Sequence, residues 1–342
     1  MKNSRDNTPQ APRGSPVKRR IKSVVFFCLY YSGLEWLLSR LIRVDATAIL
    51  MYHGVCDESP MPPDLNFHLQ RSVFEQQMRV LKRRYPVLAL RDVVDALARG
   101  ERPKKAIVLT FDDGYRNNAQ YATPILTQLQ LPVTVFVATS YIESGRWIPL
   151  NEIYWLWSSG KLSSQDLKRI RGQVRGRATA ENAQLLSGLL NGHPPAATFA
   201  AKESFDMLSW DEVRGMAEAG VDFGSHTHTH CNLAAEPPSQ QRTELELSKS
   251  TLEKRLGRPV RAFAYPFGLA EHISETARAN IVNAGFDCAL AAEYGLVTPR
   301  SDCFRLPRLG YDRHIWMFAG EILYQFALQA IRDARGTKEA HG

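Results

Sequence analysis

The chain has 342 residues, of which 44% are hydrophobic and 23% charged, a composition typical of a globular protein that can bury one large core. Its formal charge of +8 lies mainly in residues 1–22, which hold seven basic residues and one acid and leave about +2 for the rest. That balance argues against a nucleic-acid-binding protein. Five scattered cysteines with no CxxC pair indicate neither a zinc ribbon nor a disulfide framework.

The first 43 residues are predicted to form a tail and a surface helix. Residues 1–17 are polar and rich in Pro, Asn and Ser, as disordered segments are. Residues 18–43 combine basic flanks with aromatic and leucine side chains at helical spacing, which favours a helix lying on an anionic membrane surface. A helix packed on the rest of the protein is one alternative, and an uncleaved signal anchor with the folded domain outside the cell is another.

The same segment gives an expectation for localisation. Its apolar run, Val24–Leu38, is short for a membrane span, and arginines follow it in place of a small-residue cleavage site. We therefore expect a cytoplasmic protein held peripherally on the inner face of the membrane.

Apolar strands and helices alternate from residue 46 onward. Strands are predicted at 46–53, 106–111, 132–138, 221–226, 261–268, 286–292 and 304–309. About seven short strands separated by helices predict parallel βα units that close into an α/β barrel over residues 46–320. Residues 321–342 are then a C-terminal helix and tail.

Local signals mark several of the helices. Capping boxes at Ser72–Glu75 and Ser209–Glu212 predict two helix starts, and Gly257 predicts the end of a helix over 239–256. The interval 143–205 interrupts the alternation and is rich in tryptophan. It is interpreted as an insertion over the barrel mouth that can serve as a lid.

Two adjacent aspartates, Asp112 and Asp113, follow the strand over 106–111. In a regular strand they would point to opposite faces, so they share a site only where the backbone bends, which Gly114 permits. Taken alone, Asp-Asp-Gly is ordinary turn sequence. In parallel barrels, however, the chemistry gathers at the C-terminal ends of the strands, where His53 also lies.

Three histidines, His226, His228 and His230, follow the strand over 221–226. On a helical turn His226 and His230 face the same way and His228 does not, whereas in an extended chain all three share a face. Either geometry suits a metal, because imidazole and carboxylate are standard zinc ligands. Two histidines and one aspartate leave coordination positions open, as catalytic sites do, and the second aspartate can then accept a proton from a metal-activated water.

Three motifs together resemble the polysaccharide deacetylase family, carbohydrate esterase family four. They are TFDDG at 110–114, SHTHTH at 225–230 and FAYPFG at 263–268. The resemblance covers about residues 46–310. It implies a distorted (β/α)7 barrel that removes N- or O-acetyl groups from glycans.

The resemblance also implies roles for individual residues. Asp112 takes the position of the general base, and Asp113, His226 and His230 take those of the metal ligands. Phe267 stands where the family usually has tyrosine, and its backbone N–H takes the role of oxyanion donor.

The chain departs from the family pattern at two roles. Ala264 replaces the arginine that orients the base; Arg308, or less plausibly Arg261, can replace it from another strand, although a surface ion pair is the alternative role for Arg308. No late histidine motif supplies the general acid. His53 in ILMYHGV resembles the early histidine of poly-N-acetylglucosamine deacetylases with permuted motifs, and His314 is the rival acid.

The expected activity is that of a metal-dependent hydrolase of carbon–nitrogen bonds other than peptide bonds, with zinc as the expected metal. Its expected substrate is the N-acetyl group of an amino sugar in a poly- or oligosaccharide, lipid-linked or free, as in exopolysaccharide biosynthesis. Tyr265 and Trp147 are predicted to contact this glycan. The alternatives are an O-acetyl esterase or a non-sugar amidase of the same fold, and a catalytically inactive glycan-binding module.

Overall fold

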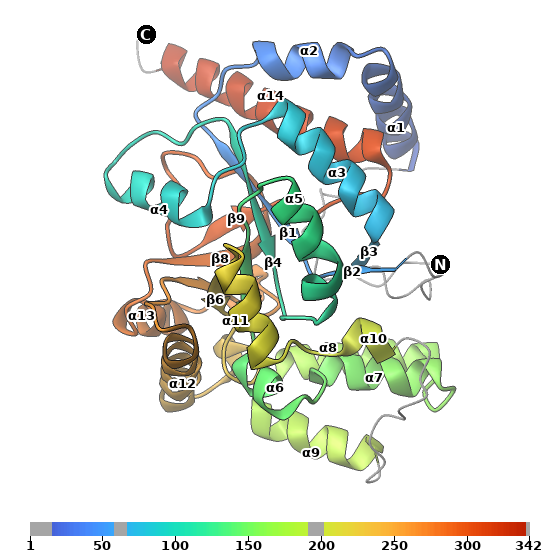
Figure 1. Ribbon diagram of the computed structural model, residues 1–342, viewed down its shortest axis with the longest axis vertical. Helices are drawn as coiled ribbons and strands as arrows, with labels where there is room; N and C mark the ends of the chain where they lie inside the picture. The colour runs from blue at the N-terminus through green and yellow to red at the C-terminus, as the bar shows by residue number, and fades with distance from the viewer. Residues whose placement is uncertain (1–15, 58–66, 191–201, 340–342) are drawn as a thin grey trace.

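Seven parallel strands form the centre of the protein. The computed structural model describes residues 16–57, 67–190 and 202–339, and its strands follow the order β1-β4-β5-β6-β7-β8-β9 in one sheet surrounded by helices (Figure 1). A parallel bridge between Leu50 in β1 and Leu309 beside β9 joins the first strand to the last. The sheet is therefore a nearly closed barrel, which confirms the predicted distorted (β/α)7 fold.

Each predicted strand is present, and most are shorter than predicted. The barrel strands are β1 (Thr47–Tyr52), β4 (Ala106–Phe111), β5 (Thr134–Val137), β6 (Asp222–Ser225), β7 (Ala262–Ala264), β8 (Cys288–Tyr294) and β9 (Leu306–Arg308). A separate small sheet pairs β2 (Gly54–Cys56) with β3 (His68–Gln70). Every residue of β1, β4, β5 and β7 is buried, as expected for strands covered on both faces.

Helices connect the strands and form the termini. They are α1 (Pro16–Tyr31), α2 (Leu34–Leu41), α3 (Arg71–Arg84), α4 (Leu90–Ala98), the π-helix η1 (Asn118–Ala122), α5 (Thr123–Gln128), α6 (Thr139–Ser144), α7 (Pro149–Ser158), α8 (Ser164–Gly176), α9 (Thr179–Leu190), α10 (Lys202–Phe205), α11 (Trp210–Glu218), the 3-10 helix η2 (Leu233–Ala235), α12 (Pro238–Leu256), the 3-10 helix η3 (Ala270–His272), α13 (Glu275–Asn283) and α14 (Ile315–Glu339). The last of these begins before the predicted boundary at residue 321.

The helix signals had different outcomes. The capping box at Ser209 is confirmed, and α12 ends before Gly257, whose φ of 66° is left-handed. The predicted box at Ser72 is wrong, because α3 begins at Arg71 with Gln70 as its N-cap. Pairing of β3 with β2 keeps the chain extended as far as Gln70 and so decides where the helix starts.

The predicted helix over 18–43 is two helices, α1 and α2, bent by 89°. The break falls at Gly33, whose φ of 76° lies in the left-handed region that ends a helix. Among the helices of the described residues, none is by itself long and apolar enough to cross a membrane; α1 and α2 pass that test only as a bent pair. The predicted tail over 1–17 lies outside the described residues, apart from residues 16 and 17, which begin α1.

One face of α1 packs on α14. The absence of a side chain at Gly320 makes this close approach possible, because a Cβ there would lie 2.4 Å from Cγ of Phe26. Lys22 and Glu321 form an ion pair of 2.5 Å across the same contact. In α2, the buried Glu35 pairs with Arg84 of α3. One side of this segment is therefore packed on the rest of the protein, as the predicted alternative of a packed helix expected.

The terminal helices and the insertion lie at opposite ends of the molecule. A short connection leads from α2 into the N-terminal end of β1, so α1 and α2 lie at that end of the barrel, together with α14 (Figure 1). Helices α7 to α10, which come from the predicted insertion over 143–205, gather at the other end, where the strands finish. The predicted functional residues at strand ends are therefore next to the insertion.

Candidate metal centre and active site

The backbone turns sharply where β4 ends. Asp113 has a φ of 74° and Gly114 a φ of 85°, and a Cβ at Gly114 would lie 2.8 Å from Cγ1 of Val137. The turn gives the two adjacent carboxylates different partners, because Asp113 contacts histidines and Asp112 contacts Arg308. Both aspartates are buried, so this segment is not a solvated turn.

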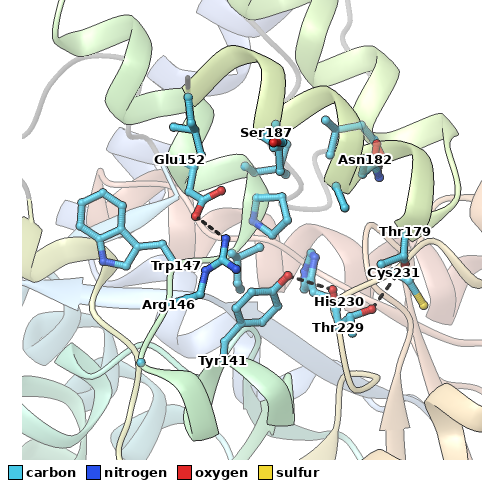
Figure 2. Close-up of a pocket in the computed structure, with 18 of the residues that line it drawn as sticks. Tyr141, Arg146, Trp147, Glu152, Thr179, Asn182, Ser187, Thr229, His230 and Cys231 are labelled. Atoms are coloured by element: carbon cyan, nitrogen blue, oxygen red, sulfur yellow. Dashed lines mark hydrogen bonds and ion pairs between the residues drawn. The ribbon is translucent and has the colours of Figure 1, made fainter. Parts of the chain in front are cut away.

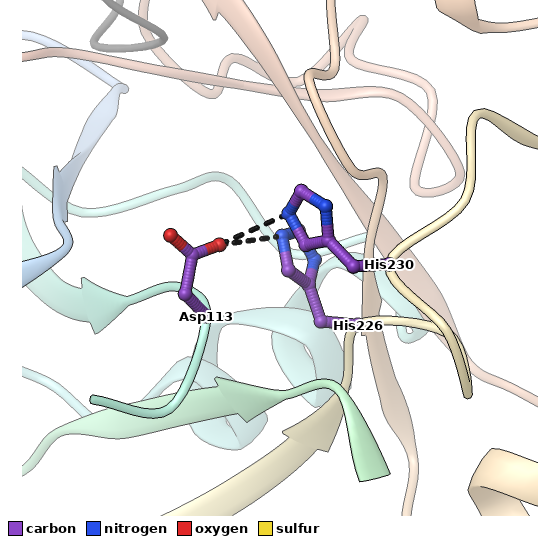
Figure 3. A group of neighbouring side chains, drawn as sticks. All are labelled: Asp113, His226 and His230. Carbon is purple, nitrogen blue, oxygen red and sulfur yellow. Dashed lines mark hydrogen bonds and ion pairs between the residues drawn. The ribbon is translucent and has the colours of Figure 1, made fainter. Parts of the chain in front are cut away.

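Asp113, His226 and His230 converge at the barrel mouth (Figure 3). Oδ1 of Asp113 lies 3.4 Å from Nε2 of His226 and 3.1 Å from Nε2 of His230, and one ligand atom from each residue lies within 4.8 Å of the others. Two ligands of a tetrahedral zinc, each about 2.1 Å from the ion, lie about 3.4 Å apart, so this spacing fits one bound ion. The structure thus brings the predicted ligand set together, and metal binding stays a prediction.

The orientation of His226 also fits a cation. Its Nδ1–H donates to the carbonyl of Ala264 at 2.7 Å, so the neutral ring has its lone pair on Nε2, which faces Asp113. A lone pair that faces a carboxylate is repelled unless a cation lies between them. A hydrogen bond to the far ring nitrogen is also how metal-binding histidines are commonly held. Burial lowers the pKa of His230 more than Asp113 raises it, which favours the neutral ring that a metal requires.

The histidine segment is neither helical nor extended. Thr227 and His230 have φ values of 64° and 54°, and these left-handed residues bring His226 and His230 together. His228 faces away, and its Nδ1 lies 2.8 Å from Oγ1 of Thr139. Glu244 of α12 holds the turn by accepting the backbone N–H groups of residues 228 and 229 at 2.9 and 2.8 Å.

Strained backbone is concentrated at this site. Five described residues other than glycine have positive φ, and four of them, Asp113, Thr227, His230 and Phe267, lie in the turns that form it. Such conformations cost roughly 1–3 kcal/mol each and persist where the surrounding structure imposes them. Strain of this kind is typical of functional sites.

Asp112 is held by a buried arginine. Nη1 and Nη2 of Arg308 donate to its two carboxylate oxygens at 2.8 and 2.7 Å, and Arg308 is 0% exposed. Burial by itself raises the pKa of Asp112, but the charge and hydrogen bonds of Arg308, together with the nearby His226 and His53, outweigh it and leave the pKa below its ordinary value. The ion pair of Arg308 is therefore buried and does not lie on the surface. Arg261 forms exposed ion pairs with Asp95 and Asp287 instead.

His53 lies where β1 ends, with a side chain that is nearly fully buried. Its Nδ1 has no hydrogen-bond partner among the described residues. Together with Asp113 and His230 it lines a narrow pocket of about 30 Å³, hereafter the narrow pocket. The rival acid, His314, is 62% exposed in its side chain and interacts with Asp312, outside the pockets described here.

A larger pocket of about 750 Å³ lies between the insertion and the barrel, hereafter the larger pocket. Figure 2 shows insertion residues such as Glu152, Asn182 and Ser187 on one side and Tyr141, Thr229 and His230 on the other. Its lining includes Ile148, Pro149, Leu150, Val174, Ala183, Leu186 and Leu190, so the wall formed by the insertion is largely apolar.

Two predicted substrate contacts have different positions. Trp147 lines the larger pocket, and its Nε1 donates to Asp206 at 3.2 Å. Tyr265 does not line either pocket; it is 1% exposed and its hydroxyl donates to the carbonyl of Phe304, so its contact with a substrate stays a prediction that these positions do not support. The ring of Phe267 packs edge-on against His230 at 5.1 Å, and its φ of 63° turns the backbone at the pocket wall. Its backbone N–H donates to no acceptor in the part of the chain described.

Sequence reasoning missed several residues of this site. Arg171 and Arg175 of α8 enter the narrow pocket, although their i,i+4 spacing in the insertion is a signal that the sequence contains. Glu244, which supports the histidine turn, had no signal in the sequence, because its contact joins distant segments.

Comparison with known proteins agrees with the motifs. A family profile described as polysaccharide deacetylase matches residues 99–289. A poly-beta-1,6-N-acetyl-D-glucosamine N-deacetylase of Staphylococcus aureus is 23% identical over 254 residues, which cover 71% of this chain and 68% of that protein. Among solved structures, the Streptococcus pyogenes deacetylase PplD in complex with acetate has a TM-score of 0.58 at 22% identity, covering 82% of this chain and 98% of that one. IcaB from Ammonifex degensii has a TM-score of 0.56 at 20% identity, with the same coverage, and both structures share the fold.

Proposed function

The chain belongs to the polysaccharide deacetylase family, and from this membership we propose that it is a metal-dependent hydrolase that removes the N-acetyl group of an amino sugar in a poly- or oligosaccharide. The observation that carries the proposal is that two adjacent carboxylates at the end of one strand are held by different partners. Asp113 faces two histidines, and Asp112, next to it, is held ionised by Arg308. A binding module has no need for a second, separately held carboxylate beside a metal.

The metal ligands in this proposal are Asp113, His226 and His230, and zinc is the preferred ion because imidazole and carboxylate are its usual ligands. A divalent metal held there would polarise the acetyl carbonyl and acidify a nearby water. The remaining chemistry falls to the side chains and backbone of the chain itself.

Four groups of the protein handle protons and charge. Asp112 accepts the proton of the attacking water, and Arg308 keeps it ionised and fixes its orientation. The backbone N–H of Phe267 donates to the oxyanion that develops on the acetyl carbonyl. His53 protonates the departing amine, which leaves poorly without a proton.

Acetate release from N-acetylglucosamine oligomers tests this proposal. The purified chain should release acetate from the oligomers when loaded with zinc, and Asp113→Ala should abolish both the bound metal and the activity. His228→Ala is a matched control, since His228 interacts with Thr139 outside the ligand set. Acetate release from an O-acetylated xylan but not from the oligomers would replace the amidase by an esterase of the same fold.

We further propose that α1 and α2 attach the protein to an anionic membrane surface, on the inner face of the cytoplasmic membrane. The pair exposes many large apolar residues: Val17, Ile21, Val24, Val25, Phe27, Tyr31, Leu34, Trp36, Leu37 and Leu41. Exposed basic residues flank them: Lys18, Arg19, Arg20, Arg40 and Arg43. An apolar face with basic flanks is complementary to an anionic lipid surface.

This attachment would direct the barrel mouth away from the membrane. Helix α2 leads into the N-terminal end of β1, and the active site lies at the opposite end of this strand, whose six residues span about 20 Å. A glycan that extends from the membrane can then reach the mouth. Full-length protein should co-sediment with phosphatidylglycerol vesicles, and a chain lacking residues 1–43 should not. If the full-length protein bound neutral phosphatidylcholine vesicles equally well, the proposed attraction between its basic residues and anionic lipid would be contradicted.

A further inference from the structure

Two arginines of the insertion enter the narrow pocket beside the candidate metal centre. Arg171 and Arg175 of α8 line this pocket together with His53, Asp113 and His230. Because they are four residues apart on a helix, they lie on the same face of α8. The roles assigned above to the catalytic and metal-binding residues leave these two arginines unused.

Arg171 is a buried charge for which the described part of the chain supplies no counter-charge. It is 6% exposed, its Nε has no hydrogen-bond partner, and no acidic side chain of the described residues pairs with it. Its guanidinium carbon lies 4.7 Å from the ring centroid of Tyr154. On the same helix, the exposed Arg169 pairs with Asp166 at 2.9 Å. An unpaired buried guanidinium is costly, so its retention beside an active site points to an anion supplied from outside.

The neighbouring aspartates do not neutralise this charge. Asp112 is already paired with Arg308, and Asp113 faces the two histidines of the candidate metal site. With a divalent cation bound there, the described side chains make the pocket positive even when both aspartates are ionised. Arg171 increases that positive charge.

The arginines are fixed relative to the catalytic loop. Nδ2 of Asn232 donates to the carbonyl of Arg175 at 2.7 Å, which joins the end of α8 to the loop after His230. Glu236 of that loop accepts the backbone N–H and the hydroxyl of Thr179 at 2.6 and 2.7 Å. The C-terminal end of helix α8 is therefore anchored to the segment that carries His230, a candidate metal ligand.

Resting on the proposed deacetylase function, we propose that Arg171 and Arg175 bind an anionic group of the glycan substrate, a phosphate or a carboxylate next to the N-acetylated sugar. Planar guanidinium groups bind both anions through paired hydrogen bonds. The substrate is then an acidic glycan or a sugar phosphate, and the arginines are specificity determinants that take no part in proton transfer.

Binding of deacetylated products tests the proposal without turnover. Titration calorimetry on the full-length, zinc-loaded chain should show that glucosamine 1-phosphate binds more tightly than methyl glucosaminide, which lacks the phosphate. Arg171→Gln and Arg175→Gln should each weaken binding of the phosphate by about 10- to 100-fold and leave the neutral sugar unchanged, since hydrogen bonds between charged groups are the strong ones. Arg169→Gln is the matched control and should change neither.

Two further measurements guard against a folding defect. Arg171→Lys keeps a cation over Tyr154 and should retain the preference for the phosphate in part, and thermal unfolding should show each variant folded. Affinity for the phosphate should also fall as NaCl rises from about 50 to 300 mM. Equal affinity for the two ligands, no binding of either, equal weakening of both by Arg171→Gln, or the same loss in Arg169→Gln would overturn the proposal.

Measurements of acetate release show whether the bound anion is a carboxylate or a phosphate. They also test the anion site separately from the proposed deacetylase function. A hyaluronan tetrasaccharide supplies a carboxylate, N-acetylglucosamine 1-phosphate supplies a phosphate, and chitotetraose supplies neither; the anionic substrate with the higher kcat/KM identifies the group. Hydrolysis of chitotetraose with no preference for either anion would overturn the anion site and leave the proposed function intact. Arginine-dependent binding of glucosamine 1-phosphate without acetate release from any substrate would overturn the function and leave the anion site.

Discussion

Replacing Arg308 by methionine is expected to change both the stability of the barrel and the protonation of Asp112. Arg308 donates two hydrogen bonds of 2.8 and 2.7 Å to the carboxylate and a third of 2.8 Å to the carbonyl of Ala291, and both charged side chains are buried. Removing one partner of such a pair leaves a buried charge without compensation, which costs about 3–5 kcal/mol in the free energy of unfolding.

The pH dependence of this loss follows from the pKa of Asp112. In the wild type that pKa is lowered, so the pair stabilises the fold above the unfolded-state pKa of about 3.9, and the stabilisation is lost as the pH falls through the lower folded-state value. Without Arg308 the strongest influence that lowers this pKa is lost, so burial makes the pKa of Asp112 higher in the variant than in the wild type. The stability deficit of the variant should therefore be largest near neutral pH and shrink in acid.

Urea unfolding and the pH dependence of kcat/KM measure these two effects. The acidic limb of the kcat/KM profile should move to higher pH in Arg308→Met, and activity should recover in alkaline buffer, where Asp112 is ionised again. Asp112→Asn should lose about 10²–10⁴-fold at every pH, because it removes the base itself. Arg305→Met is the control: its ion pair with Glu293 is partly exposed and worth less than about 1 kcal/mol. A loss in Arg308→Met no larger than in the control, or an unmoved acidic limb, would refute the reasoning.

Three further predictions concern the metal, the general acid and the terminal helices. His226→Ala should lose the bound metal, measured by inductively coupled plasma mass spectrometry, and His228→Ala should keep it because His228 contacts Thr139; equal loss in both would contradict the ligand set. His53→Gln should depress hydrolysis of N-acetylglucosamine oligomers far more than that of an aryl acetate, whose leaving group needs no proton; equal loss on both substrates would point to His314. Gly320→Ala should destabilise the chain by about 1–3 kcal/mol in urea unfolding and expose α1 to protease, because the new Cβ would lie 2.4 Å from Phe26. Gly215→Ala, where a Cβ meets nothing within 4 Å, should be neutral or stabilising, and a cost equal to that at Gly320 would show that the α1–α14 contact is not tightly packed.

Signals that are local in the sequence predicted much of this protein correctly. Runs of apolar residues gave the barrel strands, because a strand buried on both faces must be apolar along its length. The capping box at Ser209 and the stop at Gly257 are confirmed because each depends on a few neighbouring residues. The positions of Asp113, His226 and His230 at strand ends predicted that they would meet, since the ends of parallel strands share one face of a barrel.

Predictions failed or stayed open where contacts between distant segments decide the outcome. The helix expected from Ser72 begins at Arg71 because the preceding residues pair with β2. The geometry of the three histidines could not be chosen from spacing, because Glu244 of α12 holds the turn in a conformation that is neither helix nor strand.

The partner of Asp112 was decided by the order of strands in the barrel. Arg261 and Arg308 were both candidates in the sequence, and β9 closes against β1, the neighbour of β4, so only Arg308 reaches the carboxylate. Likewise, the arginines of α8 acquire their place beside the candidate metal site only when the insertion packs on the histidine loop. Strand and helix periodicity depends on residues a few positions apart and is visible in the sequence, whereas the surroundings of a buried charge depend on which distant segments pack against it.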